Sequence, residues 1–121
     1  MKVILRLLQI SLLLVSGVTQ ASETMVKNVV VNKVSTEKYN FSVTLEHADK
    51  SWDHYANVWQ VETTTGEVLA KRILQHPHIN EQPFTRSLSA VVIEGDIKEV
   101  VIVAGCTVDG INSNKFAVTL P

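Results

Sequence analysis

The sequence predicts an all-β protein, an antiparallel sandwich of seven short strands, and three observations support this prediction. Short β-branched or alternating runs recur from residue 25 onward, separated by Gly, Asp, Asn and Lys. No window in this part of the chain keeps a helical period of apolar residues. Cys106 is the single cysteine, so no disulfide can form within the chain and the apolar core must hold the fold. Seven strands without intervening helices favour two packed antiparallel sheets.

The strands follow from the spacing of apolar residues. The clearest is 39–47, where every second residue from Tyr39 to Leu45 is apolar, as expected of a strand with one buried face. A turn at 63–66 separates the third and fourth strands. The seven strands are expected at 25–34, 39–47, 54–62, 67–74, 84–93, 98–107 and 116–120. The expected core includes Tyr39, Phe41, Val43, Leu45, Trp59, Val101, Val103 and Phe116.

Residues 1–21 have the layout of a secretory signal peptide. Lys2 and Arg6 precede an apolar run at 7–15, and small residues lead to a cleavage site after Ala21. The run is shorter than the roughly 20 residues that span a bilayer, although an uncleaved N-terminal anchor is the alternative. No cysteine follows it, so a lipid anchor is not expected. We therefore expect a periplasmic or secreted protein with a single domain at 22–121.

The charge balance argues against two classes of partner. The chain has 11 basic and 12 acidic residues, and loss of Lys2 and Arg6 with the leader leaves 9 and 12, a net charge of −3. A mildly acidic domain without a basic cluster does not favour nucleic acid or an anionic membrane surface. No nucleophile–base pair, phosphate loop or paired-carboxylate motif can be read from the chain, so we do not expect an enzyme. Two classes remain: a ligand- or metal-binding module, and a structural or interaction domain that contacts another protein.

The stretch 76–87, His-Pro-His-Ile-Asn-Glu-Gln-Pro-Phe-Thr-Arg-Ser, is the densest group of functional side chains. Its two prolines fix their own backbone and push the residues before them toward extended conformations. We expect an ordered loop with its side chains held in place. The loop either pins a crossing between the sheets or presents ligands at a binding site.

All four histidines are expected at one end of the sandwich. Successive strands run up and down, so the connections 48–53, 75–83 and 108–115 share an end. Imidazole, thiolate and carboxylate groups suit zinc or copper. The predicted metal ligands are His47, His54, His76 and His78, with Cu or Zn as the candidate cofactor. A ligand-binding surface made of Trp52, Glu81, Arg86 and Asp109 is the non-metal alternative.

Each of these residues also has a structural interpretation. His76 and His78 could bind neighbouring backbone and lock their loop against Trp52 or Tyr55 instead of binding a metal. Arg86 could bind an anion, or it could pair with an acidic residue such as Glu81, Asp53 or Asp49. Trp52 could stack on a ligand or cover the core. Cys106 is expected to be a buried, inert thiol.

The strand order resembles that of the immunoglobulin and fibronectin type III superfamily. Trp59 fits the position of the buried tryptophan of immunoglobulin domains, while the lone cysteine favours the disulfide-free, fibronectin-like branch. The segment 76–87, together with Trp52-Asp53-His54-Tyr55, resembles a group of small exported bacterial proteins of unassigned function. That resemblance implies no activity. Members of the group often have His where Asp109 precedes Gly110, so this chain departs from an all-histidine site.

Overall fold

The computed structural model describes residues 23–121, so the expected signal peptide lies outside the described residues. The strands are β1 Met25–Ser35, β2 Lys38–Glu46, β3 Ala56–Glu62, β4 Val68–Ile73, β5 Phe84–Val92, β6 Glu99–Cys106, β7 Gly110–Ile111 and β8 Phe116–Thr119. All pair antiparallel, and the described part contains no helix. The expected count of seven is wrong by one, because the chain doubles back after Cys106 and forms the two-residue strand β7.

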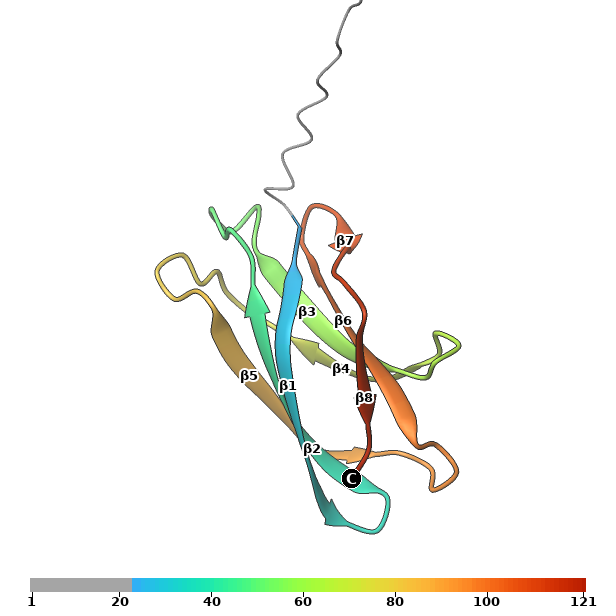
Figure 1. The fold of residues 1–121 in the computed structure, drawn as a ribbon. Coiled ribbons are helices and arrows are strands. Elements are labelled where there is room, and N and C mark those ends of the chain that lie inside the picture. The colour runs from blue at the N-terminus through green and yellow to red at the C-terminus, as the bar shows by residue number, and fades with distance from the viewer. Residues whose placement is uncertain (1–22) are drawn as a thin grey trace, which may run out of the picture.

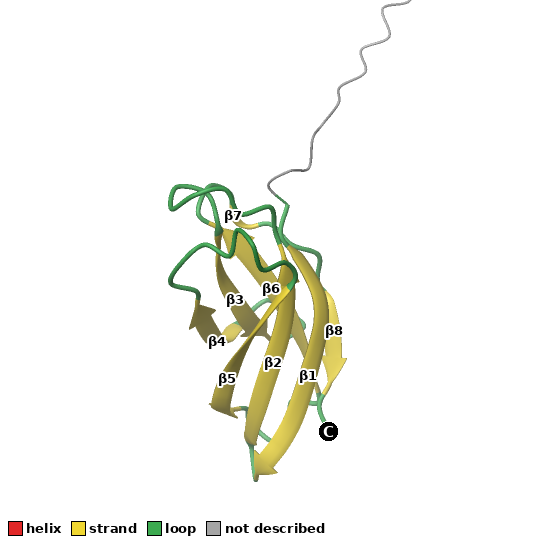
Figure 2. Cartoon of the chain, turned by 90° about the vertical axis from the view of Figure 1, so that its left-hand side faces the viewer, coloured by secondary structure: helices red, strands yellow, loops and turns green. Residues whose placement is uncertain are grey.

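The strands form two sheets that face each other. One has the order β1-β2-β5, and the other has the order β4-β3-β6-β7, with β8 also paired to β6. Figure 2 shows β5, β2 and β1 side by side in front of β3, β4 and β6. Buried residues of both sheets form one hydrophobic cluster between them. This all-β, disulfide-free arrangement agrees with the prediction, and Cys106 is buried and not part of a disulfide.

The alternation in β2 is confirmed by burial. Phe41, Val43 and Leu45 are fully buried, whereas the residues between them are only partly buried. Trp59 on β3 is also fully buried and belongs to the same core cluster as the buried residues of β2. Burying an aromatic or branched side chain stabilises the folded chain by about 1.5–3 kcal/mol. This shared apolar layer holds the sheets together and fixes which loops meet at their ends.

Three details of the core differ from the prediction. On β6 the core residues are Val100, Ile102 and Ala104, so Val101 is only partly buried, although Val103 is buried as expected. Phe116 is also only partly buried, and packs against the edge of the core. In β3 a register shift between Ala56 and Val58 puts Ala56 into the core. Such a bulge inserts one residue and changes which side chains face inward.

The loops β2–β3, β4–β5 and β6–β7 gather at one end of the molecule (Figure 1, top). All four histidines lie in these loops: His47 and His54 between β2 and β3, and His76 and His78 between β4 and β5. Across residues 23–121, no helix has the length and apolar character needed to cross a membrane.

Candidate functional site

A buried carboxylate, Asp49, lies at the centre of the loop end. Its Oδ1 accepts hydrogen bonds from Nδ1 of His47 (2.6 Å) and from the backbone N–H of Ala56 (2.9 Å). Its Oδ2 accepts one from the backbone N–H of His78 (2.7 Å). The residue is 7% exposed, and it is the one acidic residue among the buried polar residues of the described chain. Three donors compensate for the loss of water around the charge, so Asp49 ties the β2–β3 and β4–β5 loops together.

His47, His54 and Cys106 form a group of three candidate metal donors. One ligating atom from each lies within 4.8 Å of the other two. His47 and Cys106 are buried, and His54 is partly buried. The rings of His47 and His54 meet edge to face, with centroids 5.0 Å apart. Tetrahedral zinc with bonds of about 2.0–2.3 Å holds its donors about 3.3–3.5 Å apart, so donors as far apart as 4.8 Å need to approach one another by about 1 Å to share an ion.

The hydrogen bonding of the two imidazoles is compatible with a bound metal. An ionised carboxylate only accepts hydrogen bonds, so Nδ1 of His47 carries the proton and Nε2 is the nitrogen that can ligate. Carboxylates often orient metal-binding histidines in this manner. Nε2 of His54 is buried and has no hydrogen-bond partner within the described residues. A buried polar atom without a partner is costly, and a metal ion at this point would remove that cost.

Donor groups also surround the sulfur of Cys106. The backbone N–H of Asp109 points at Sγ from 3.4 Å, and the Asn112 amide from 3.8 Å. Sγ in turn lies 3.6 Å from Oδ2 of Asp109. Hydrogen bonds to a ligating sulfur tune its affinity and electronic properties at metal centres. The expected inert thiol thus lies in a polar environment that is suited to a ligand.

Strand pairing brings these residues together. Cys106 is the last residue of β6 and pairs with Ala56 at the start of β3, two residues after His54. Thr107 fixes the adjacent turn, since its Oγ1 donates to the Asp53 carbonyl (2.9 Å) and accepts from the N–H of Tyr55 (3.2 Å). Cys106 is thus placed by the end of β6, whereas His47 and His54 lie in the β2–β3 loop that flanks it.

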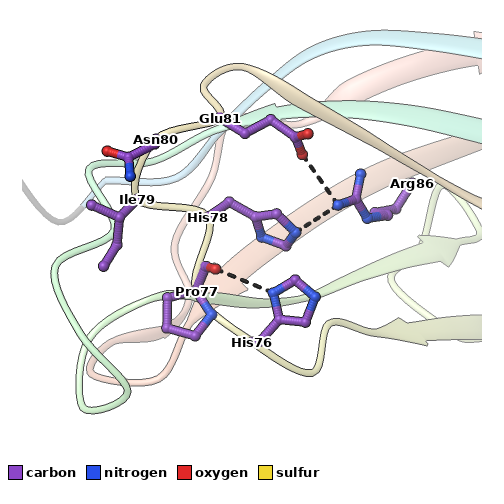
Figure 3. A pocket seen from close by; sticks show the side chains of 7 residues that line it. All are labelled: His76, Pro77, His78, Ile79, Asn80, Glu81 and Arg86. Carbon is purple, nitrogen blue, oxygen red and sulfur yellow. Dashed lines mark hydrogen bonds and ion pairs between the residues drawn. The ribbon is translucent and has the colours of Figure 1, made fainter.

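The second pair of histidines is arranged differently. His76 and His78 lie with ring centroids 4.6 Å apart in a shallow pocket of about 470 Å³. Figure 3 shows Arg86 reaching between Glu81 and His78, while Ile79 and Asn80 point away from it. The Nη2 of Arg86 lies 2.7 Å from Nε2 of His78 and 3.1 Å from Oε1 of Glu81.

This geometry occupies the ligating nitrogen of His78. A guanidinium can only donate, so Nε2 of His78 must accept, and its lone pair is directed at Arg86. Burial lowers the pKa of His78, and the charges of Arg86 and His76 lower it further. The neutral ring stacks on Phe84 with centroids 4.0 Å apart. His78 therefore serves as a packed and hydrogen-bonded part of the loop.

The remaining predicted site residues are placed as follows. Arg86 pairs with Glu81, one of the acidic partners expected for it. Trp52 is 68% exposed and meets the edge of Tyr55, so its expected role as a cover for the core is wrong. The His-Pro-His loop is locked against Phe84 and Asp49, rather than against Trp52 or Tyr55. Asp109 lies beside Cys106 and not beside His76 and His78.

Sequence reasoning missed two central residues. The sequence suggests Asp49 only as a partner for Arg86, yet Asp49 binds the ring of His47 and the backbone of His78. Gln82 was not considered, yet its Oε1 accepts from the N–H of His47 (3.1 Å) and its Nε2 donates to the His78 carbonyl (2.9 Å). One signal was present for Asp49, because an acidic residue two positions after a histidine can orient its ring.

Comparison with known proteins gives limited information about this chain. No family model and no solved structure matches it. A stretch of 79 residues is 43% identical to a protein of Halomicrobium mukohataei described as "Putative lipoprotein". That match covers 65% of this chain and 39% of the relative, so the chain corresponds to well under half of the relative's length. The comparisons therefore assign no family.

Proposed function

We propose that this protein is a small exported binding module that holds a zinc or copper ion between His47, His54 and Cys106. The observation that carries the proposal is the clustering of three donor atoms within 4.8 Å of one another. Two imidazoles and a thiolate are a donor set that both metals favour. The carboxylate behind His47 and the N–H groups around the sulfur support the proposal further.

A second role, as a structural clasp, fits the His-Pro-His loop. Its histidines were the other half of the expected metal site, but Arg86 occupies the nitrogen of His78. Asp49 and Gln82 hold the loop's backbone at two points. In this reading, 76–87 stabilises the end of the sandwich, and the protein acts as an interaction domain whose partner contacts lie elsewhere. The clasp and the metal site are adjacent and do not exclude one another.

The architecture and compartment complete the proposal. We propose a fibronectin type III-like or immunoglobulin-like domain, and the division of the strands into the sheets β1-β2-β5 and β4-β3-β6-β7 supports this. The leader-like residues 1–21 and the lipoprotein description of the relative favour export, to the periplasm or beyond. We propose a binding role without catalysis, because the two imidazoles and the thiol of this site are a donor set that suits a metal. The near balance of 11 basic and 12 acidic residues does not favour nucleic acid as a partner.

Titration of the metal-free protein with Zn(II), and with Cu(I) under reducing conditions, tests the proposal. We expect one ion per chain, and a loss of affinity of about 100-fold or more in Cys106→Ser and His54→Ala. The control is the double variant His76→Ala, His78→Ala, which should bind both metals like the parent if it remains folded. A parent that binds neither metal would exclude a metal-binding role. Binding lost in the double variant but kept in Cys106→Ser would move the site to the His-Pro-His loop.

A further inference from the structure

The turn after β6 folds Asp109 back onto Cys106. Cys106 pairs with Gly110, which closes the turn with a φ of 67° that favours glycine. Gly105 permits this return, because a Cβ at that position would lie 2.3 Å from the Gly110 carbonyl oxygen. The close approach of β7 to β6 thus depends on two glycines. It sets an exposed aspartate directly over the candidate metal-binding sulfur.

The spacing between this aspartate and the sulfur matches that of two ligands on one zinc ion. A tetrahedral ion with bonds of about 2.3 Å to sulfur and about 2.0 Å to oxygen separates those atoms by about 3.5 Å. Oδ2 of Asp109 lies 3.6 Å from Sγ of Cys106, where it accepts the thiol proton. A metal ion that displaces that proton would therefore find the carboxylate within reach. Asp109 is outside the group of mutually close donors, so its side chain must turn toward the histidines when the ion binds.

Ligand number and ligand type separate Zn(II) from Cu(I) at this site. His47, His54 and Cys106 supply three donors, and a fourth ligand completes the tetrahedral shell that zinc favours. Zinc also accepts a carboxylate oxygen as a ligand. Cu(I) prefers soft sulfur and nitrogen donors and gains little from a carboxylate.

We propose that Asp109 is the fourth ligand of the site and makes it selective for Zn(II) over Cu(I). This inference rests on the proposed function, since it requires that His47, His54 and Cys106 hold an ion. It assigns Asp109 a role in metal preference, although the resemblance to exported bacterial proteins leads one to expect a histidine there. The metal ion replaces the departing thiol proton between Sγ of Cys106 and the carboxylate oxygen of Asp109, and Asp49 stays behind His47.

The test compares Asp109→Asn with Asp53→Asn, an exposed aspartate in the β2–β3 loop at the same end of the molecule. Affinities for Zn(II) and Cu(I) would be measured by competition with chromophoric chelators, the latter under anaerobic reduction. Asp109→Asn should weaken Zn(II) binding by about 10- to 100-fold and change Cu(I) binding by less than about threefold. Asp53→Asn should change neither affinity by more than about twofold.

The possible outcomes separate this inference from the proposed function. A parent that binds Zn(II), with an Asp109→Asn variant of equal affinity, would overturn the fourth ligand and leave the three-donor site standing. Equal losses for both metals would overturn the selectivity. A parent that binds neither metal would overturn both proposals. Circular dichroism and thermal unfolding of metal-free Asp109→Asn should match those of the parent, because the side chain is exposed.

Discussion

Two pairs of histidines lie at the same end of this protein, and their nitrogens are engaged differently. In the first pair, Nδ1 of His47 donates to a carboxylate and Nε2 of His54 is buried without a partner in the described chain. In the second pair, Nε2 of His78 accepts from Arg86, while Nδ1 of His76 lies 3.2 Å from the Pro77 carbonyl oxygen. The comparison teaches that a count of imidazoles does not locate a metal site. The position of the thiol does, because Cys106 lies within reach of His47 and His54.

Asp49 links two regions: the first contains the His47–His54 pair, and the second contains the His76–His78 pair. Each of its oxygens serves one pair, through the ring of His47 and through the backbone of His78. A change at Asp49 should therefore affect both regions. A change at a residue that contacts only one histidine pair should affect only that region.

Asp49→Ala should lower the free energy of unfolding by about 3 kcal/mol. The substitution leaves three buried donors, on His47, Ala56 and His78, without an acceptor. Denaturant unfolding followed by tryptophan fluorescence measures the effect. Asp53→Ala, at an exposed position, is the control and should stay within about 0.5 kcal/mol of the parent. A loss below about 1 kcal/mol for Asp49→Ala would mean that the carboxylate does not hold the two regions together.

Gly105→Ala should cost about 2 kcal/mol and should act on the first region alone. The added Cβ meets the backbone of Gly110, so β7 must move away from β6 and take Asp109 with it. Gly95→Ala is the control, because its Cβ would meet only the flexible side chain of Glu37 at 3.2 Å. Thermal unfolding of both variants, with amide chemical shifts around His78, provides the measurement. Unchanged stability, or shifts that spread to His78, would contradict this assignment.

Arg86→Ala should act on the second region and cost at most about 1 kcal/mol. Its ion pair with Glu81 is partly open to solvent, with side chains 31% and 60% exposed, and such pairs contribute little. The variant frees Nε2 of His78 and removes a positive charge, so the pKa of His78 should rise. Unfolding experiments and an NMR titration of the His78 ring measure both effects. A loss of several kcal/mol would make Arg86 part of the core network.

The smallest effect is a dependence of stability on pH through His78. Burial lowers its folded-state pKa, so the unfolded chain binds this proton more readily. The neutral ring's contribution is present above the unfolded pKa of about 6.5 and is lost as the pH falls from there toward the folded value. His78→Gln should show a weaker acid destabilisation than the parent in urea titrations between about pH 7.5 and 5.5. Identical pH profiles for the two proteins would contradict this role.

Much of the fold can be predicted from the sequence, because local patterns decide it. The alternation from Tyr39 to Leu45 marks a buried face, and the turn residues between the strands set the order of the loops. The buried face of β6 cannot be predicted in this way. Residues 100–104 are all apolar, so their spacing does not show which of them face the core. The bulge between Ala56 and Val58 depends on pairing with β6, which no local pattern encodes.

In the candidate site, too, local sequence predicts one part and long-range contacts decide the other. The gathering of the histidines at one end followed from the strand count, but their bonding partners did not. Cys106 reaches the histidines through its pairing with Ala56, fifty residues earlier in the chain. Asp49 acquires its role only when His78 arrives from the β4–β5 loop. These contacts are long-range, and a single sequence carries little information on them.

We propose that the ion binds among His47, His54 and Cys106 rather than at the His-Pro-His loop. X-ray absorption at the zinc edge of the Zn(II)-loaded protein tests it most directly, because sulfur and nitrogen scatter at different distances. We predict one sulfur at about 2.3 Å, with nitrogen or oxygen atoms at about 2.0 Å completing the shell. A shell of nitrogen and oxygen alone would contradict the account, because no other residue of the chain can supply a thiolate.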